Sequence, residues 1–295
     1  MRRFALGLVT ALACPTSVLA QTAPAADAKP EKWDVNAPPG LTTRKVPIAV
    51  DEGSWMNVDV APDGRTGAFD LLGDIYTMPI EGGTPTRIAA GLAFEHQPRF
   101  SPDGKRIAFV SDAGGGDNIW LMNRDGSDRR QLSKEDFRLL NQPSWSPDGQ
   151  FIVAKKHFTT GRSLGTGEVW MYHVSGGAGV PLVKRVNEKH QKELGEPIFA
   201  PDGKAIYYTR NVTPGPIFEY AQDSNTDLFH IERYDLNDGE VSTVASGPGG
   251  AVRPSPSPDG KRLAFVRREG MASKLYVKDL ASGAEQKVYD ALDQD

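Results

Sequence analysis

The residue types that most often carry chemistry are few in this sequence, and their spacing does not match a metal site. None of the five histidines forms a His-x-His or His-Glu-x-x-His pair, and the single cysteine is Cys14. Zinc sites in proteins are usually built from ligands at such short spacings. The sequence therefore predicts neither a metal site nor a cofactor in this chain.

Two other patterns resemble reactive or ion-binding sites. Gly161 to Gly165 reads G-x-S-x-G with Ser163 at its centre, but a nucleophile elbow needs a strand before it and a helix after it. Here the motif falls between two expected strands of one hairpin, so we predict no catalytic residue. Stretches 112–117 and 223–227 are rich in aspartate but lack EF-hand spacing. We interpret their aspartates as turn formers.

Five polar residues stand at a fixed distance from a repeated turn. The tripeptide Pro-Asp-Gly occurs five times, and the sixth residue before each of its aspartates is polar or charged: Asn57, Gln97, Gln142, Glu196 and Arg253. If each lies on the innermost strand of a repeat, together they form a ring at the mouth of a central channel. Such a ring could hold a ligand group or a bridging water. Alternatively, it supplies only the polar wall that a wet channel needs.

The elements that would position this ring are short strands. Pro-Asp-Gly closes tight hairpins because proline fixes φ, aspartate caps the backbone and glycine accepts positive φ. Successive aspartates are 40, 45, 54 and 57 residues apart, a period typical of propellers or solenoids. The first repeat shows four β-runs, at 56–61, 67–71, 75–80 and 85–89. Four antiparallel strands per repeat predict an all-β propeller with five complete blades.

The start of the predicted propeller contains one unmatched run. Residues 44–50 resemble an outermost strand with no first three strands before it. We interpret them as the orphan strand of an incomplete sixth blade, which would make this chain a truncated part of a longer polypeptide. A five-bladed ring with one stray strand is the alternative.

Loop lengths indicate which face of the propeller carries function. The turns within the first and second hairpins of each blade are short, whereas the loops between second and third strands vary and are longest at 157–167 and 211–227. Long loops on a rigid scaffold are common sites of binding. On this variable-loop face we select five candidates for contact with a ligand or partner: His96, His157, His190, Tyr220 and Asp223.

The N-terminus reads as an export signal. Arg2 and Arg3 precede an apolar stretch, and small residues lead to a cleavage site after Ala20. We expect a signal peptide at 1–20, a flexible linker at 21–40 and the propeller at 41–295, in a periplasmic or secreted protein. The formal net charge of −4 gives no support for nucleic-acid binding, and no segment predicts membrane insertion of the mature protein.

The repeats resemble a known propeller family. Residues 101–109, read with Asn118-Ile119-Trp120 and Asp125-Gly126, are similar to the repeat of TolB, the periplasmic component of the Tol–Pal system. This resemblance implies a TolB-like β-propeller and, as one alternative, a stand-alone module that binds a periplasmic protein.

A second resemblance covers the chain from about residue 33 to its end. Secreted bacterial amidohydrolases carry such a propeller before a catalytic barrel, and five segments look like that family: 33–40, 51–55, 69–76, 155–161 and 219–227. The resemblance implies a parent enzyme that hydrolyses C–N bonds with a divalent metal such as zinc. It also implies that the propeller controls substrate access or docks against the C-terminal catalytic domain. The family's His-x-His motif is missing here, so no catalytic residue is carried over. The propeller of a prolyl-oligopeptidase-type peptidase is a further alternative.

Overall fold

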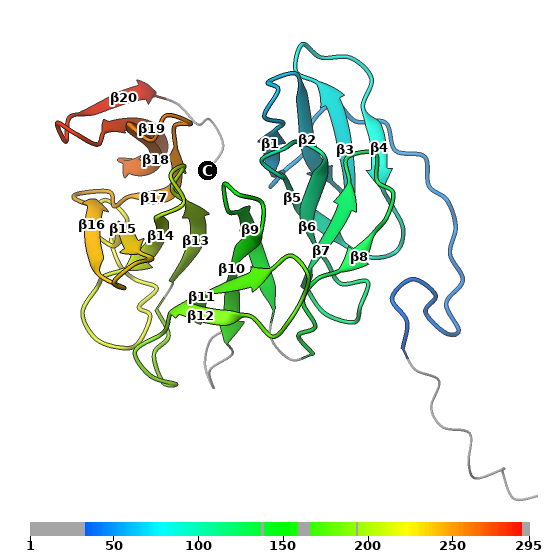
Figure 1. Cartoon of the computed structure of the whole chain (residues 1–295), viewed down its shortest axis with the longest axis horizontal. Coiled ribbons are helices and arrows are strands. Elements are labelled where there is room, and N and C mark those ends of the chain that lie inside the picture. The colour runs from blue at the N-terminus through cyan, green and yellow to red at the C-terminus, as the bar shows by residue number, and fades with distance from the viewer. Residues whose placement is uncertain (1–32, 137–138, 159–165, 193, 291–295) are drawn as a thin grey trace, which may run out of the picture. The chain divides into compact units, whose positions relative to one another are not determined.

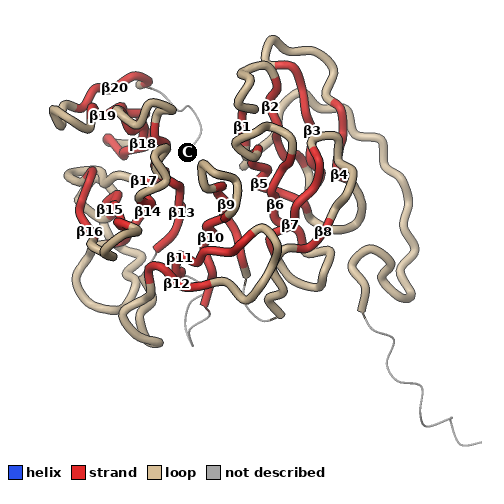
Figure 2. Tube along the Cα trace, viewed as in Figure 1, coloured by secondary structure: helices blue, strands red, loops and turns tan. Residues whose placement is uncertain are grey.

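The computed structural model describes residues 33–136, 139–158, 166–192 and 194–290. These described residues belong to one compact unit. The predicted signal peptide, most of the linker and the G-x-S-x-G serine at position 163 lie outside the described residues. Figure 2 shows strands joined by loops throughout the described part, in which no residue is helical. No helix there has the length and apolarity needed to cross a membrane.

Within the described residues, twenty strands form five four-stranded antiparallel sheets, labelled in Figure 1. The first blade contains β1 (Val58–Val60), β2 (Thr66–Leu71), β3 (Asp74–Pro79) and β4 (Thr86–Ala89). The second contains β5 (Glu95–Phe100), β6 (Arg106–Ser111), β7 (Asn118–Asn123) and β8 (Arg130–Gln131). The third contains β9 (Leu140–Trp145), β10 (Phe151–Phe158), β11 (Thr166–His173) and β12 (Val180–Val183).

The last two blades repeat this order. The fourth contains β13 (Leu194–Phe199), β14 (Ala205–Asn211), β15 (Phe229–Asp235) and β16 (Val241–Ala245). The fifth contains β17 (Val252–Pro256), β18 (Arg262–Glu269), β19 (Ala272–Asp279) and β20 (Glu285–Tyr289). The expected five-bladed all-β propeller is thus confirmed, with strands in sequence order across every blade.

The Pro-Asp-Gly turns act as hairpin closers. In the second blade Asp103 Oδ1 accepts hydrogen bonds from Ser101 Oγ at 2.6 Å and from the backbone N–H of Lys105 at 3.1 Å. These bonds are the main cause that lowers the pKa of Asp103. Gly104 has φ of 67°, a backbone conformation that favours glycine. The aspartate therefore folds its own turn through Oδ1.

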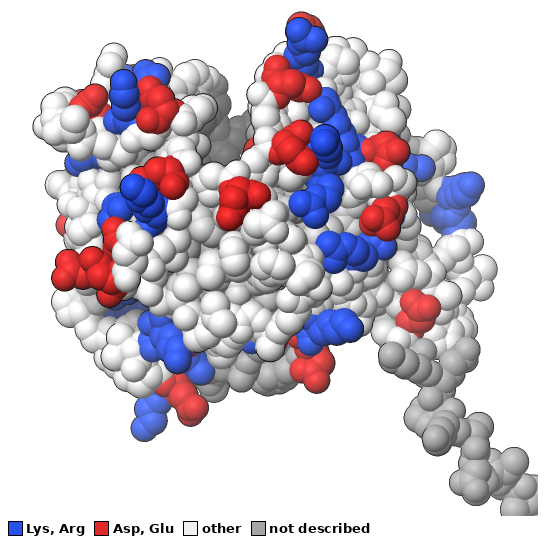
Figure 3. All heavy atoms as spheres, in the orientation of Figure 1, with Lys and Arg blue, Asp and Glu red and all other residues white. Residues whose placement is uncertain are grey.

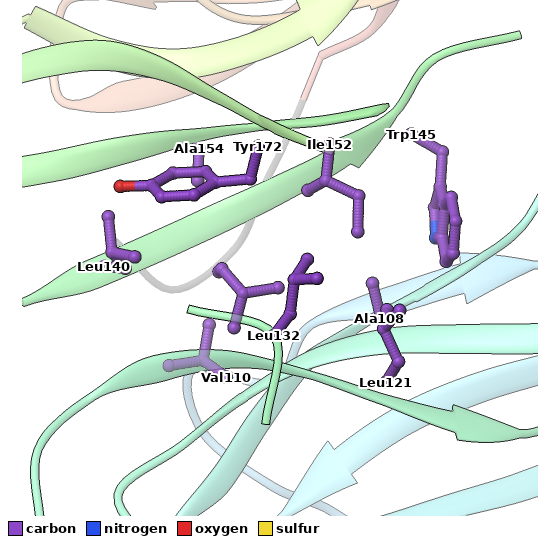
Figure 4. Close-up of a cluster of buried hydrophobic side chains, with 10 residues drawn as sticks. Ala108, Val110, Leu121, Leu132, Leu140, Trp145, Ile152, Ala154 and Tyr172 are labelled. Carbon is purple, nitrogen blue, oxygen red and sulfur yellow. The ribbon is translucent and has the colours of Figure 1, made fainter. Parts of the chain in front are cut away.

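Apolar cores lie between successive blades. Figure 4 shows the core between the second and third blades, where Val110 and Leu121 face Ile152 and Tyr172. A similar cluster occupies each of the other three junctions between consecutive blades. The innermost strands pack in series, β1 on β5, β5 on β9, β9 on β13 and β13 on β17. Among the described residues, no strand of the fifth blade packs on the first to a comparable extent.

The unmatched run at 44–50 does not form the expected strand. Residues 41–50 are exposed and belong to no sheet. An isolated β-run has no ladder partner for its N–H and C=O groups, and in water it gains nothing from the extended pairing geometry. The β-branched residues of this run explain why the sequence predicted a strand there.

Candidate functional site

The five predicted ring residues do meet at one cavity. It has a volume of 660 Å³ and is lined by the innermost strand of every blade, including Asn57, Gln97, Gln142, Glu196 and Arg253. Many of the other lining residues are prolines and serines, and the lining carries four charged side chains: Asp59, Arg99, Glu196 and Arg253. The repeat spacing therefore located the channel wall correctly, while a binding role for the ring stays a prediction.

A backbone irregularity places the ring side chains. Four ring residues adopt left-handed φ values between 53° and 56°, and each precedes a proline: Gln97, Gln142, Glu196 and Arg253. At the same four places the ladder to the neighbouring strand shifts register, as at a β-bulge. Proline is tolerated there because a bulge has no ladder position for its missing N–H. The bulge also turns the ring residue's N–H out of its own sheet.

Each of these N–H groups donates a hydrogen bond to a side-chain oxygen of the preceding blade. We call this series of hydrogen bonds the inter-blade relay. The N–H of Gln142 donates to Gln97 Oε1 at 2.6 Å, and the N–H of Glu196 donates to Gln142 Oε1 at 2.7 Å. The N–H of Arg253 then donates to Glu196 Oε2 at 2.7 Å. Each side chain thus satisfies a backbone donor that would otherwise lose its partner, at a cost of about 1–3 kcal/mol each. The ring side chains therefore connect neighbouring blades by hydrogen bonds.

The relay begins at a residue that repeat alignment does not reveal. Asp70, on β2, accepts from the N–H and the Nδ2 of Asn57 at 2.8 and 2.9 Å, and from the N–H of Gln97 at 2.7 Å. Asn57 has a shorter side chain than Gln97, and the buried Asp70 carboxylate takes its place as the cap. The available signal was the Phe-Asp-Leu stretch at 69–71, which puts a charge in an otherwise apolar strand.

The relay ends at Arg253 because a guanidinium donates hydrogen bonds and accepts none. The Arg253 side chain is 74% exposed, and its Nε lies 3.8 Å from Glu196 Oε1. It caps no backbone N–H in the part of the chain that the structure describes. Its charge faces the cavity and is only loosely paired.

A second row of side chains lies deeper in the channel. Asp59 Oδ2 accepts from the N–H of Phe100 at 2.7 Å, again across a blade junction. Burial is the main cause that raises the pKa of Asp59, and the nearby Arg99 opposes it. Arg99 Nη1 donates to the carbonyls of Val58 and Pro98 at 3.2 and 2.9 Å. Burial lowers the pKa of Arg99, and the charge of Arg253 acts in the same direction.

Lys155 lies behind the ring in the third blade. It is 4% exposed, and its burial lowers its pKa to about 8 although the charge of Glu196 opposes the shift. The Lys155 side chain runs so close to Gly195 that a Cβ there would come within 2.6 Å of its Cδ. The sequence pattern does not mark this lysine, because a charged residue in a strand usually faces solvent.

None of the candidate histidines lines the cavity that the ring residues share, and each makes contacts with other protein groups. The imidazole of His96 packs against the phenyl group of Phe94, with 5.3 Å between their centroids. Burial lowers the pKa of His96, and three nearby aspartates oppose this shift. Asn141 Nδ2 lies 2.9 Å from His157 Nε2. His190 lines a cavity of only 20 Å³, where burial first and the charges of Lys192 and Arg210 next lower its pKa.

The remaining loop candidates are exposed. Tyr220 is 84% exposed and packs edge-on against Phe218 at 4.9 Å. Asp223 Oδ1 accepts from the N–H and the Nδ2 of Asn225, so it caps a turn as expected for an aspartate-rich loop. Among the described residues, no three His, Cys, Asp or Glu side chains are grouped as metal ligands would be. Charges of both signs are interspersed on the face shown in Figure 3.

Comparison with known proteins fits this geometry. Residues 41–214 match the model of a family described as PD40, TolB beta propeller domain. The chain belongs to the TolB beta-propeller domain family. It is similar to the Tol-Pal system protein TolB of Francisella tularensis, at 30% identity over 226 residues that cover 75% of this chain and 45% of that protein.

Two further comparisons extend this result. The uncharacterized peptidase YuxL of Bacillus subtilis is 28% identical over 190 residues, which cover 52% of this chain and 29% of that protein. The chain thus spans less than half the length of both curated relatives. The solved structure of a putative TolB from Agrobacterium tumefaciens matches with a TM-score of 0.62 at 20% identity over 79% of each chain. That likeness shows the shared propeller fold.

Proposed function

We propose that this chain is the non-catalytic propeller of a secreted or periplasmic metal-dependent amidohydrolase. In this proposal it limits substrate access to the C-terminal catalytic domain or docks against it, and the parent enzyme hydrolyses C–N bonds with a metal such as zinc. The observation that supports a non-catalytic role most directly is the inter-blade relay. It commits Gln97, Gln142 and Glu196 to holding blades together.

Three observations favour a propeller that works with a separate catalytic part. No group of metal-ligating side chains occurs in the described residues. The chain covers only 29% of a relative that is named as a peptidase, so related propellers occur within longer proteins. The five segments from 33–40 to 219–227 that resemble secreted amidohydrolases are distributed along the described chain.

The test is to identify the native polypeptide. An antibody raised against this chain would be used on the periplasmic fraction and the medium of the source cells. We expect a polypeptide clearly larger than this chain, with Gln21 as its first residue. The immunopurified protein should hydrolyse N-acyl amino acids or cyclic amides, lose this activity with 1,10-phenanthroline and regain it with Zn²⁺. Activity lost to a serine-reactive phosphonate, but not to the chelator, would indicate a prolyl-oligopeptidase-type parent.

A stand-alone TolB-like interaction module is the second candidate. It is favoured by the match at 30% identity to a Tol-Pal system protein. In this case the antibody would detect a native polypeptide of the size of this chain without its leader, and the purified chain would retain a peptidoglycan-associated lipoprotein. That result, without amide hydrolysis, would reject the amidohydrolase proposal.

A further inference from the structure

The relay leaves two amide NH₂ groups of the ring as unused hydrogen-bond donors. An amide side chain has one oxygen and one NH₂ group, and a backbone N–H can be capped only by the oxygen. Because Gln97 Oε1 and Gln142 Oε1 cap the next blade, the orientation of both amides is fixed. Both residues are half-buried and line the cavity, and neither Nε2 donates to another described protein group.

At least one oxygen of each carboxylate near the ring is already engaged by a backbone N–H. The Asp70 carboxylate accepts three hydrogen bonds, two of them from backbone N–H groups. Glu196 Oε2 accepts from the N–H of Arg253 and from Thr209 Oγ1 at 2.6 Å. Asp59 Oδ2 is held by the N–H of Phe100. A molecule that enters the cavity therefore meets the two amide NH₂ groups and the Arg253 guanidinium, while these carboxylate oxygens already hold backbone N–H groups.

From this arrangement we propose that the channel mouth binds a carboxylate group. The two amide Nε2 atoms of Gln97 and Gln142 donate to its oxygens, and the exposed Arg253 guanidinium supplies the charge. Hydrogen bonds from neutral and cationic donors to an anion are about twice as strong as those between neutral groups. Arg99 adds a second positive charge deeper in the same cavity.

The charges of the lining favour an anion with a single negative charge, because the desolvation cost rises with the charge of the ion and a nearly neutral lining repays little of it. Asp59 and Glu196 balance Arg99 and Arg253, so the cavity is close to neutral before a ligand enters. A dianion such as phosphate would gain from the two arginines but would be repelled by both carboxylates. The volume of 660 Å³ lies in the range of small-ligand sites, about 300–1,000 Å³, and leaves room for the group that carries the carboxylate. This site stands whether or not the parent enzyme is an amidohydrolase.

The experiment titrates the purified chain with sodium acetate at constant ionic strength and follows the side-chain NH₂ resonances of Gln97 and Gln142 by ¹H–¹⁵N NMR. Acetate should shift both resonances saturably. Neutral acetamide, sodium chloride and phosphate serve as comparison ligands, and each should leave these resonances without a saturable shift. Equal shifts with acetate and with chloride or acetamide would overturn the proposal.

Two variants separate binding from folding. Gln142→Glu keeps the oxygen that caps the N–H of Glu196 but replaces the Nε2 donor by a second carboxylate oxygen, so acetate binding should be lost in a folded protein. Arg253→Gln should weaken acetate binding about tenfold, the equivalent of about 1.4 kcal/mol. The exposed Arg262→Gln in the same blade is the matched control and should bind as the wild type does. Unchanged binding by Gln142→Glu would overturn the proposal.

A final arm distinguishes the source of the carboxylate. Blocked acetyl-Pro-Glu-Pro-amide carries one side-chain carboxylate on a short peptide, and acetyl-Pro-Gln-Pro-amide is its neutral control. Tighter binding of the glutamate peptide than of acetate would identify an acidic side chain of a polypeptide as the ligand. Binding of acetate but not of the peptide would identify a small free acid. Failure of both to bind would reject the site.

Discussion

The second and fifth blades have closely similar sequences but different surroundings. The second strand reads Ile107-Ala108-Phe109-Val110 in one and Leu-Ala-Phe-Val in the other, at 263–266. The residues that face the preceding blade are fully buried in both, for example Phe109 and Phe265. The residues that face the following blade differ, because Val110 is buried whereas Val266 is only half-buried.

This difference shows that the repeat pattern does not determine burial by itself. A blade has two apolar faces, and each is buried only by a neighbouring blade. Val110 contributes to the core that includes Ile152 and Tyr172 of the third blade. None of the four core clusters within the described residues contains Val266.

Hydrogen bonding at the ring also differs between interior blades and the fifth blade. Gln142 caps a backbone N–H of the fourth blade, whereas Arg253 at the equivalent position of the fifth blade caps none. The second to fourth blades therefore make apolar contacts and relay hydrogen bonds with a blade on both sides. Among the described residues, the fifth blade makes both kinds of contact only with the fourth.

The largest expected effect tests apolar packing with one substitution in two places. Val110→Ala should lower the free energy of unfolding by about 2.5 kcal/mol, because it leaves a cavity among buried side chains. Val266→Ala should cost less than about 1 kcal/mol, since solvent or small movements fill the space. Urea unfolding monitored by fluorescence would measure both. Equal losses would mean that the outer face of the fifth blade is as tightly packed as an interior junction.

The next effect tests the relay. Gln142→Leu should cost about 2 kcal/mol, because the buried N–H of Glu196 loses its acceptor. Gln142→Glu retains an oxygen at that place and should recover most of the loss. Gln150→Leu, at an exposed turn position, is the control and should stay within about 0.5 kcal/mol. A Gln142→Glu variant as unstable as Gln142→Leu would show that the capping bond is not what stabilises the junction.

A smaller effect concerns the buried lysine behind the ring. The folded-state pKa of Lys155 is about 8, whereas an unfolded lysine has a pKa of about 10.4. Between these values the unfolded chain binds a proton that the folded protein has released, so the free energy of unfolding rises with pH. From pH 7.5 to about 9.5 the gain should be about 1.8 kcal/mol, and Lys155→Met should lack it.

The pH window ends there for a specific reason. Burial raises the pKa of Tyr208, so above about pH 10 the unfolded chain loses a proton that the folded protein keeps, and stability falls again. Titration of urea midpoints in the wild type and in Lys155→Met would separate the lysine from all other groups. Parallel curves for the two proteins would contradict the assignment to Lys155.

Sequence patterns were sufficient for the fold and for the position of the ring. Five turns with the same chemistry located the hairpins, and counting back six residues from each aspartate found Gln97, Gln142 and the other ring members, because repeats conserve geometry as well as type. The pattern could not show that a bulge turns the N–H groups of four ring residues toward the preceding blade. Only the fold brings Gln97 Oε1 and the N–H of Gln142 together across 45 residues.

Substitutions within a repeat were harder to foresee. Asp70 replaces an apolar residue on its strand and serves as the first cap, a role that depends on the short side chain of Asn57, which lies directly before the neighbouring strand β1. Lys155 escaped notice because burial of a charge is a tertiary property. The run at 44–50 failed in the opposite way, because local strand propensity is not enough without a pairing partner.

The smallest expected effect is also the most decisive for the contrast between Gln142 and Arg253. Arg253→Gln should change the free energy of unfolding by less than about 0.5 kcal/mol, because its guanidinium is mostly exposed and its contact with Glu196 is long. The backbone N–H at 253, which the relay does use, is unaffected by the substitution. If Arg253→Gln were as destabilising as Gln142→Leu, side chains at all ring positions would be structural. The near-neutral result expected here leaves the Arg253 charge available for a ligand, since a side chain that adds little to folding can be kept for binding.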